Sequence, residues 1–192
     1  MNDKVFDPKK LARLNNPERI QEFPVDFVVH EAGLDNPKTV IDFGTGTAFF
    51  SRAIARRFPA STVYALDISD VMIDWIKSNV LPDYPGIVPL LIERNSLDLP
   101  LEAESAELLI MVNLHHELDD PVLLLKSCRQ MLKSGGVIAI SDWRKEEMEK
   151  GPRYEIRCEP ETVRDQLEKS GFSNIRIYRD FPHNFLLLGE KG

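Results

Sequence analysis

The chain has 192 residues and a formal net charge of −7, with 43% hydrophobic and 29% charged residues. Such a length and composition are typical of one globular domain with a substantial core. The acidic balance argues against a nucleic-acid-binding protein, because contacts to phosphates require an excess of Lys and Arg. Two cysteines, Cys128 and Cys158, give no disulfide framework, and no apolar run approaches membrane-spanning length. We therefore expect a single-domain cytoplasmic protein without membrane contact.

The first 23 residues are polar, with scattered apolar positions. Residues 8–14 form a plausible short helix, which Asn15-Asn16-Pro17 would end. Segment 1–23 is either a flexible terminal arm or a cap over the mouth of a site built by residues 24–192.

Helix and strand patterns alternate through the rest of the chain. Helical spacing predicts helices over 24–32, 47–58, 71–79 and 160–171, and another that Pro121 opens and residues 133–136 close. Strand patterns, nearly all apolar, fall at 39–43, 62–67, 87–92, 106–112 and 137–142. This alternation predicts an α/β fold, a parallel sheet with helices on both faces. The last two strand patterns, 175–178 and 185–188, are joined by a short connection, which implies an antiparallel hairpin.

A glycine turn follows the first strand. Strand 40–43 runs into Gly44-Thr45-Gly46 and then a helix start, an arrangement that presents free backbone N–H groups at the carboxyl edge of a sheet. A dinucleotide-binding turn usually has a third glycine, but Phe49 occupies that position, which weakens an NAD interpretation. The alternative pattern, D-x-G-x-G-x-G, fits with Asp42 before the turn, except that Ala48 replaces the last glycine.

Five stretches in order carry a family resemblance: 40–47, 63–69, 95–101, 107–116 and 131–142. On these stretches the chain resembles class I S-adenosylmethionine-dependent methyltransferases, especially the small-molecule branch of ubiquinone/menaquinone-type and type 11 enzymes. That resemblance implies a Rossmann-like doubly wound fold, with a mostly parallel seven-stranded sheet and an antiparallel C-terminal hairpin. It implies S-adenosyl-L-methionine as cofactor, S-adenosyl-L-homocysteine as product, and transfer of a methyl group to a small-molecule acceptor.

Several residues then have expected places around the cofactor. Asp67 ends the second strand about 20 residues past the turn, where a carboxylate can accept both ribose hydroxyls. Ile68 would lie against the adenine ring, with Met72 adding to that wall. Gly44, Thr45 and Gly46 would pass under the methionine part. Asp42 would orient its ammonium group, directly or through water, since an ionised carboxylate only accepts hydrogen bonds.

The third and fourth strands add four more expected contacts. Asn95 stands where the family often has Asp, and its carbonyl can still accept from the adenine amino group. Ser96 and Leu97 would offer backbone N–H groups to the ring. Asn113, just after the fourth strand, would meet the methionine end.

Candidates for catalysis follow the same strand. In-line methyl transfer requires a positioned acceptor and exclusion of water, and it needs a base only where the acceptor must lose a proton. His116, and less favourably His115, could be that base or could orient the acceptor; alternatively the pair only shapes the pocket wall. No metal site is expected, because adjacent His side chains diverge and no third ligand has a recognisable spacing.

The acceptor itself is not encoded in a recognisable motif. Residues 113–116 are Asn-Leu-His-His rather than the D/N-P-P-Y/F of amino-group methylases, so DNA-adenine and glutamine-amide methylation are not favoured. Two alternatives stay open: a cofactor-binding regulatory protein without turnover, and an NAD-dependent oxidoreductase. A homodimer also stays open. Side chains that could touch the acceptor or lie on a solvated face are Trp143, Arg144, Arg153, Tyr154, Arg157 and His183.

Overall fold

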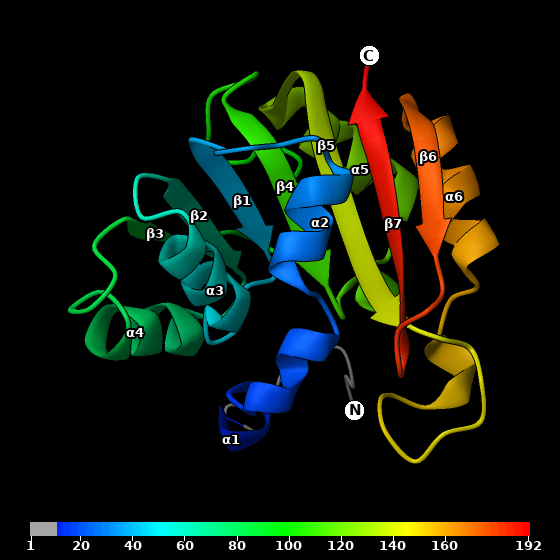
Figure 1. Cartoon of the computed structure of the whole chain (residues 1–192), viewed down its shortest axis with the longest axis horizontal. Helices are drawn as coiled ribbons and strands as arrows, with labels where there is room; N and C mark the ends of the chain where they lie inside the picture. Colours follow the sequence, from blue (N-terminus) through cyan, green and yellow to red (C-terminus); the bar gives the residue numbers. More distant parts are fainter. Residues whose placement is uncertain (1–10) are drawn as a thin grey trace.

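A computed structural model describes residues 11–192, which form a seven-stranded sheet covered by helices on both faces (Figure 1). The strand order is β3-β2-β1-β4-β5-β7-β6; β1 to β5 pair in parallel, whereas β7 is antiparallel to both β5 and β6. The predicted Rossmann-like fold with an antiparallel finish is therefore confirmed. The strands are β1 Thr39–Phe43, β2 Thr62–Asp67, β3 Ile87–Leu91, β4 Ala106–Val112, β5 Leu132–Trp143, β6 Phe172–Tyr178 and β7 Asn184–Lys191.

Six α-helices connect or precede these strands in the described part of the chain. Side chains cap two of these helices: Ser69 Oγ accepts from the N–H of Met72 at the start of α4, and Asp120 Oδ1 accepts from the N–H of Leu123 at the start of α5. No helix within residues 11–192 is long and apolar enough to cross a membrane. Of the helix expected over 8–14, residues 8–10 lie outside the described residues. The helices are α1 Leu11–Leu14, α2 Val25–Glu31, α3 Phe49–Arg57, α4 Asp70–Asn79, α5 Pro121–Met131 and α6 Pro160–Lys169.

Two apolar clusters fill the two faces of the sheet. Val40 and Leu108 point toward the layer of α2, α3 and α4, whereas their neighbours Ile41 and Leu109 point toward α5 and α6. Successive side chains of a strand face opposite sides, so a strand buried on both faces must be apolar at nearly every position. This explains the continuous apolar patterns that identified the strands. By the same alternation, Asp42 and Asp67 point toward the α3 side.

The fifth strand starts earlier than expected. The sequence places residues 133–136 at the end of a helix, but α5 ends at Met131 and β5 begins at Leu132. Leu132 pairs with Ala106 and Val137 pairs with Leu108, so residues 133–136 bulge out of the ladder between these pairs. A left-handed Gly135, with φ of 73°, permits the bulge.

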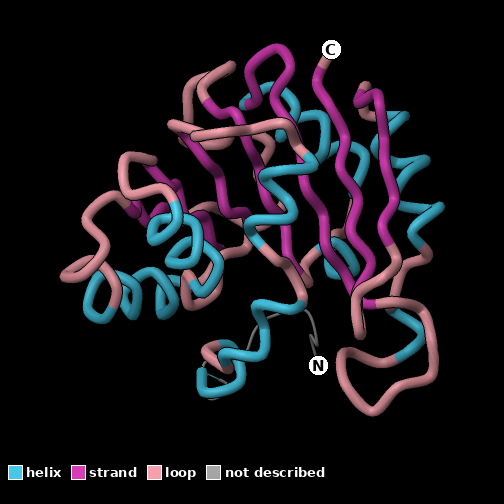
Figure 2. The backbone as a smooth tube through the Cα atoms, in the orientation of Figure 1, coloured by secondary structure: helices cyan, strands magenta, loops and turns pink. Residues whose placement is uncertain are grey.

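The candidate site lies at the carboxyl ends of the parallel strands. The parallel strands end at the same edge, and the N-terminal helices and the loop after β5 extend beyond it (Figure 2). An ion pair of 3.7 Å between Lys150 of that loop and Glu18 of the N-terminal segment joins the two. Residues 11–23, called here the N-terminal arm, therefore lie over the carboxyl ends of the strands rather than away from them.

Candidate functional site

A cavity of about 1850 Å³ opens at the carboxyl ends of the strands. Pockets for one small ligand usually measure roughly 300–1,000 Å³, so this space can accommodate two ligands side by side. The glycine turn lies on its wall together with the ends of β2 and β4, the N-terminal arm and the segment after β5.

The glycine turn depends on left-handed backbone. Gly44 and Gly46 have φ of 75° and 56°, and a Cβ on Gly44 would clash with the Leu114 side chain. Ala48, at φ 55°, is also left-handed and fully buried directly before α3. This conformation explains why a glycine suits position 48, and an alanine there costs about 1–2 kcal/mol of backbone strain.

Asp42 holds the turn onto α3. Its Oδ2 accepts from Thr45 Oγ1 at 2.8 Å, from the backbone N of Ser51 at 3.1 Å and from Ser51 Oγ at 2.5 Å. Burial raises the pKa of Asp42, and the hydrogen bonds from Ser51 and Thr45 oppose that rise. The carboxylate also lines the cavity, so one oxygen is committed to the turn and the other remains for a ligand or water.

Asp67 joins the turn to the end of β2. Its Oδ2 accepts from the N–H of Gly46 at 2.7 Å and its Oδ1 from Ser69 at 2.9 Å. Burial raises the pKa of this carboxyl group, and the backbone hydrogen bonds, led by that of Gly46, oppose the rise. Each oxygen can still accept a further hydrogen bond from a ligand in the cavity, which Asp67 lines.

The expected adenine contacts do not all reach the cavity. Ile68, Asn95, Ser96 and Leu97 line it; Ile68 is 40% exposed and Leu97 is 42% exposed, high values for apolar side chains. Met72 is fully buried and lies outside the lining, so the structure does not bring it to the cavity with the other four residues. The reason is its position in α4, three residues past the cap, where its side chain turns into the protein.

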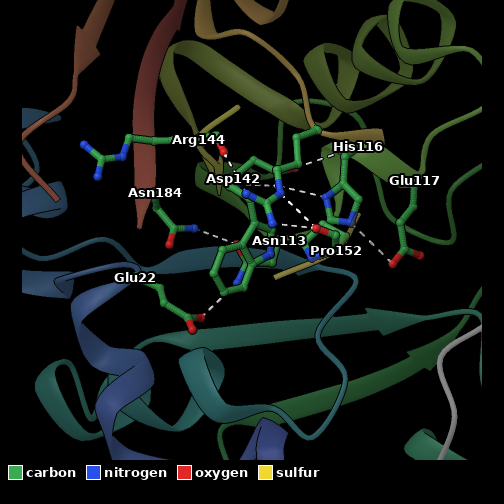
Figure 3. Close-up of polar contacts among 10 residues, drawn as sticks. Glu22, Asn113, His116, Glu117, Asp142, Arg144, Pro152 and Asn184 are labelled. Carbon is green, nitrogen blue, oxygen red and sulfur yellow. Dashed lines mark hydrogen bonds and ion pairs between the residues drawn. The ribbon is translucent and has the colours of Figure 1, made fainter. Parts of the chain in front are cut away.

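Asn113 fastens the N-terminal arm to the sheet. Its Nδ2 donates to Glu22 Oε2 at 2.9 Å, and its Oδ1 accepts from Asn184 Nδ2 at 2.6 Å (Figure 3). The same Glu22 oxygen accepts from Arg19 Nε at 2.9 Å, and the Glu22 carbonyl accepts from Ser141 Oγ at 2.6 Å. Glu22 thereby links the arm to the ends of β4, β5 and β7.

His116 forms a polarised pair with Asp142 (Figure 3). Its Nδ1 is 2.8 Å from Asp142 Oδ1, and its backbone N–H donates to Asp142 Oδ2 at 3.0 Å. An acceptor-only carboxylate fixes the proton on Nδ1, so the lone pair of the neutral ring is on Nε2, 3.8 Å from Glu117 Oε1. Burial lowers the pKa of His116, but the hydrogen bond and charge of Asp142, with the charge of Glu117, outweigh burial and leave the pKa raised.

His115 points elsewhere. Its side chain is 1% exposed, its Nε2 is 2.7 Å from Gln166 Oε1 of α6, and it lies outside the cavity lining. Burial lowers the pKa of His115, which keeps the ring neutral. Adjacent residues of the 3-10 helix His115–Glu117 project in different directions, so of the two histidines only His116 lines the cavity.

Comparison with known proteins decides between the ligand classes that the turn leaves open. A family model described as a methyltransferase domain, of the type 11 kind, matches residues 41–140.

The chain belongs to this methyltransferase family.

Its domain is therefore of the class I S-adenosylmethionine-dependent methyltransferase type, whose cofactor is S-adenosylmethionine. An NAD-dependent oxidoreductase does not fit these findings.

Solved structures and curated relatives agree with this assignment. A methyltransferase from Aquifex aeolicus is 29% identical with a TM-score of 0.87, and the match covers 96% of this chain and 98% of that one. Malonyl-[acyl-carrier protein] O-methyltransferase from Methylococcus capsulatus is 25% identical over 80% of this chain and 60% of its own length. The enzyme of that name from Halalkalibacterium halodurans is 27% identical over 56% of this chain and 40% of its own length. The chain thus spans about half the length of these curated relatives.

Some site residues of this methyltransferase were not predicted. Asp142 was visible as a polar residue ending an apolar strand, but only the structure pairs it with His116. Glu22 and Asn184 had no sequence signal, because their roles depend on contacts between segments far apart in the chain. Within residues 11–192, no group of three or more His, Cys, Asp or Glu side chains is arranged to hold a metal ion.

The segment after β5 divides into lining and supporting residues. Among the six predicted acceptor contacts, Trp143, Arg153 and His183 line the cavity, whereas Arg144, Tyr154 and Arg157 lie outside the lining. Arg157 is instead buried behind the loop.

Proposed function

We propose that this methyltransferase methylates a small molecule by in-line displacement, with His116 as the base that removes a proton from the acceptor. The observation that carries the proposal is that His116, which is hydrogen-bonded to the buried Asp142, lines the same cavity as the glycine turn. A buried base with a directed lone pair is needed only where an acceptor must lose a proton.

The cofactor side of the cavity fits S-adenosylmethionine. The left-handed glycine turn lets the methionine part approach the backbone, with Asp42 and Asn113 near its polar end. Asp67, whose oxygens retain accepting capacity, suits the two ribose hydroxyls. Adenine would cover the exposed apolar surfaces of Ile68 and Leu97, between Asn95 and Ser96.

The protein's own residues supply the rest of the chemistry. Bound S-adenosylmethionine supplies an activated methyl group on a sulfonium. His116 Nε2 takes the acceptor proton, and Asp142 stabilises the imidazolium that results. The N-terminal arm and the loop after β5 lie over the cavity, where they exclude water from the reacting atoms.

A direct test uses binding and turnover together. We expect S-adenosylhomocysteine, but not NAD, to give a saturable heat of binding. With labelled S-adenosylmethionine and a panel of phenols, enols, amines and carboxylates, we expect label to enter acceptors that carry an ionisable hydroxyl. His116→Gln should reduce that transfer by about 10²-fold or more while S-adenosylhomocysteine binding is retained. His30→Gln, at a side chain 84% exposed on α2, is the matched control.

Two other outcomes would identify different functions. Tight binding of S-adenosylhomocysteine with no transfer to any acceptor would favour a regulatory protein without turnover. Transfer to carboxylates that is indifferent to His116→Gln would favour a carboxylate acceptor, as the names of the malonyl-[acyl-carrier protein] O-methyltransferases suggest for those relatives. A carboxylate is already ionised near neutral pH, so the His116–Asp142 pair would then have no proton to remove.

A further inference from the structure

Trp143 is fixed beside the proposed base. It ends β5 opposite Asn184 of β7, and its backbone N–H donates to Asp142 Oδ1 at 2.7 Å. That oxygen is the one that accepts from His116 Nδ1. One buried carboxylate therefore sets the positions of both residues, and both line the cavity.

Loop backbone covers part of the indole. Gly151 has φ of 93°, and a Cβ on it would lie 2.8 Å from two indole ring carbons, Cδ2 and Cε3. Real Cβ atoms do not approach so closely, so the loop can pack on the ring at this distance only through a glycine. The ring is thus backed by main chain while Trp143 still lines the cavity.

A buried arginine holds that backbone in place. Arg157 is 5% exposed, and its guanidinium donates to carbonyl oxygens on both sides of Gly151: Lys150 O at 3.0 Å and Pro152 O at 2.7 and 2.9 Å. A further bond of 2.6 Å reaches Glu146 O. A rigid fork that binds several carbonyls at once fixes the loop before any ligand arrives. Arg157 is therefore a positioning residue, and Trp143 is a preorganised aromatic wall.

We propose that the acceptor of this methyltransferase is a planar aromatic compound with an ionisable hydroxyl, which stacks on Trp143 and presents its hydroxyl to His116. The proposal rests on the proposed function and names its substrate class. An aromatic ring gains offset stacking on a fixed indole that a saturated ring of equal size does not gain. A phenolic hydroxyl, with a pKa of about 10, requires the base that Asp142 and His116 form.

The polarised base argues for a hydroxyl acceptor. Asp142 holds the proton on His116 Nδ1, so Nε2 can take the hydroxyl proton, and the charges of Asp142 and Glu117 stabilise the protonated ring that results. In the proposed step the hydroxyl proton moves to His116 Nε2 as the hydroxyl oxygen bonds to the methyl carbon. The carbon–sulfur bond breaks, its electron pair stays on sulfur, and S-adenosylhomocysteine leaves.

The test monitors the NMR resonance of the Trp143 indole N–H group. Trp75 and Trp143 are the two tryptophans of the chain, so Trp75→Phe assigns the Nε1–H resonance of Trp143 in the ¹⁵N-labelled protein. With S-adenosylhomocysteine at saturation, we titrate 2-naphthol, its saturated counterpart decahydro-2-naphthol and 1-naphthylmethylamine. We expect 2-naphthol to shift the Trp143 resonance saturably and to bind about 3- to 10-fold more tightly than decahydro-2-naphthol, the gain of aromatic stacking. Replacement of S-adenosylhomocysteine by S-adenosylmethionine should then give methylated naphthol.

Substitutions at Trp143 and Arg157 distinguish an effect on acceptor binding from a general loss of folding. Trp143→Leu should reduce naphthol binding by about 3- to 10-fold, and Trp143→Phe should restore most of it, with S-adenosylhomocysteine affinity unchanged in both. Arg157→Lys, which keeps the charge but loses the fork, should weaken naphthol binding in the same way.

Three results would overturn the proposal: equal binding of the saturated alcohol, preference for the amine, or an unmoved Trp143 resonance while S-adenosylhomocysteine binds. Failure to bind S-adenosylhomocysteine would instead refute the proposed function.

Discussion

Asp142 shows how one residue can set a reaction centre. Its carboxylate accepts from His116 Nδ1, from the His116 backbone and from the Trp143 backbone, and its side chain is 1% exposed. Removing the charge while keeping the shape would alter both the tautomer of His116 and the position of Trp143. The base, the wall and the strand end are therefore coupled through this single carboxylate.

This coupling predicts a pH profile. The pKa of His116 is raised above its ordinary value of 6.5, so kcat/KM should fall as the pH drops through that raised pKa, because the protonated ring cannot accept a proton. Asp142→Asn removes the charge that raises the pKa, so the acid limb should move to lower pH. The plateau rate should also fall about 10²-fold or more, because the negative charge that fixes the proton on Nδ1 and stabilises the imidazolium is lost. If the acid limb of the kcat/KM profile stays at the same pH in Asp142→Asn, a group other than His116 is responsible for it.

Asp67 should contribute chiefly to cofactor affinity. Asp67→Ala removes the proposed acceptor for the ribose hydroxyls and the partner of Gly46 N–H, so S-adenosylhomocysteine binding should weaken by about 1–3 kcal/mol in a calorimetric titration. Asp74→Asn, at a carboxylate 76% exposed on α4, should leave the affinity unchanged. Equal affinities for Asp67→Ala and the parent protein would remove the ribose assignment.

Single residues could be predicted from the sequence where their conformation depends only on the neighbouring chain. The turn residues Gly44 and Gly46 could be predicted, because left-handed backbone after a buried strand requires glycine at those positions. The preference for His116 over His115 has no local determinant in the sequence, because it depends on the directions in which a short 3-10 helix projects its side chains. The sequence likewise does not show that helix α4 turns the Met72 side chain into the protein and away from the cavity.

At the scale of elements, the Glu22 side chain is one of the groups that hold the N-terminal arm against the end of the sheet. Glu22 accepts from Arg19 and Asn113 through Oε2, so Glu22→Ala removes the link between the arm and the end of β4. Hydrogen bonds to charged groups contribute about 1.5–3 kcal/mol, so local opening of the arm should increase about 10-fold or more. Trypsin cleavage after Arg13 and Arg19 should accelerate accordingly, as followed by mass spectrometry.

Glu22→Gln provides the matched variant for that experiment. Its amide oxygen can still accept a hydrogen bond, so cleavage should be slower than in Glu22→Ala. Cleavage that is equally slow in Glu22→Ala and the parent protein would mean that the contacts of Arg19 with Phe49 and Phe50 suffice to hold the arm.

Whole elements were predicted where burial alone specifies them. The bounds of β1, β2 and β4 match the apolar patterns, because strands covered on both faces are apolar at most positions. The early starts of β5 and β6 were missed, since each includes a register shift, in the pairing of β5 with β4 and of β6 with β7. The apolar pattern of a single strand contains no information about such a shift.

At the scale of the whole molecule, the cavity is assembled from segments that meet only in the folded chain. The N-terminal arm, the glycine turn after β1 and the loop after β5 line one space, and the Glu18–Lys150 ion pair joins two of them. A ligand that touches all three segments should therefore increase the free energy of unfolding and also reduce local opening of the N-terminal arm.

S-adenosylhomocysteine at 100 times its Kd should add about 2.7 kcal/mol to the free energy of unfolding, which for a chain of this size raises Tm by roughly 5–11 °C. The same concentration should slow tryptic cleavage of the arm in the parent protein. In Asp67→Ala the Tm shift should shrink with the lost affinity, whereas in Glu22→Ala the Tm shift should persist and the protection of the arm should be lost. This difference follows because Asp67 acts on the ligand and Glu22 acts on the arm. A Tm shift without protection in the parent protein would mean that the arm closes over the cavity independently of the cofactor.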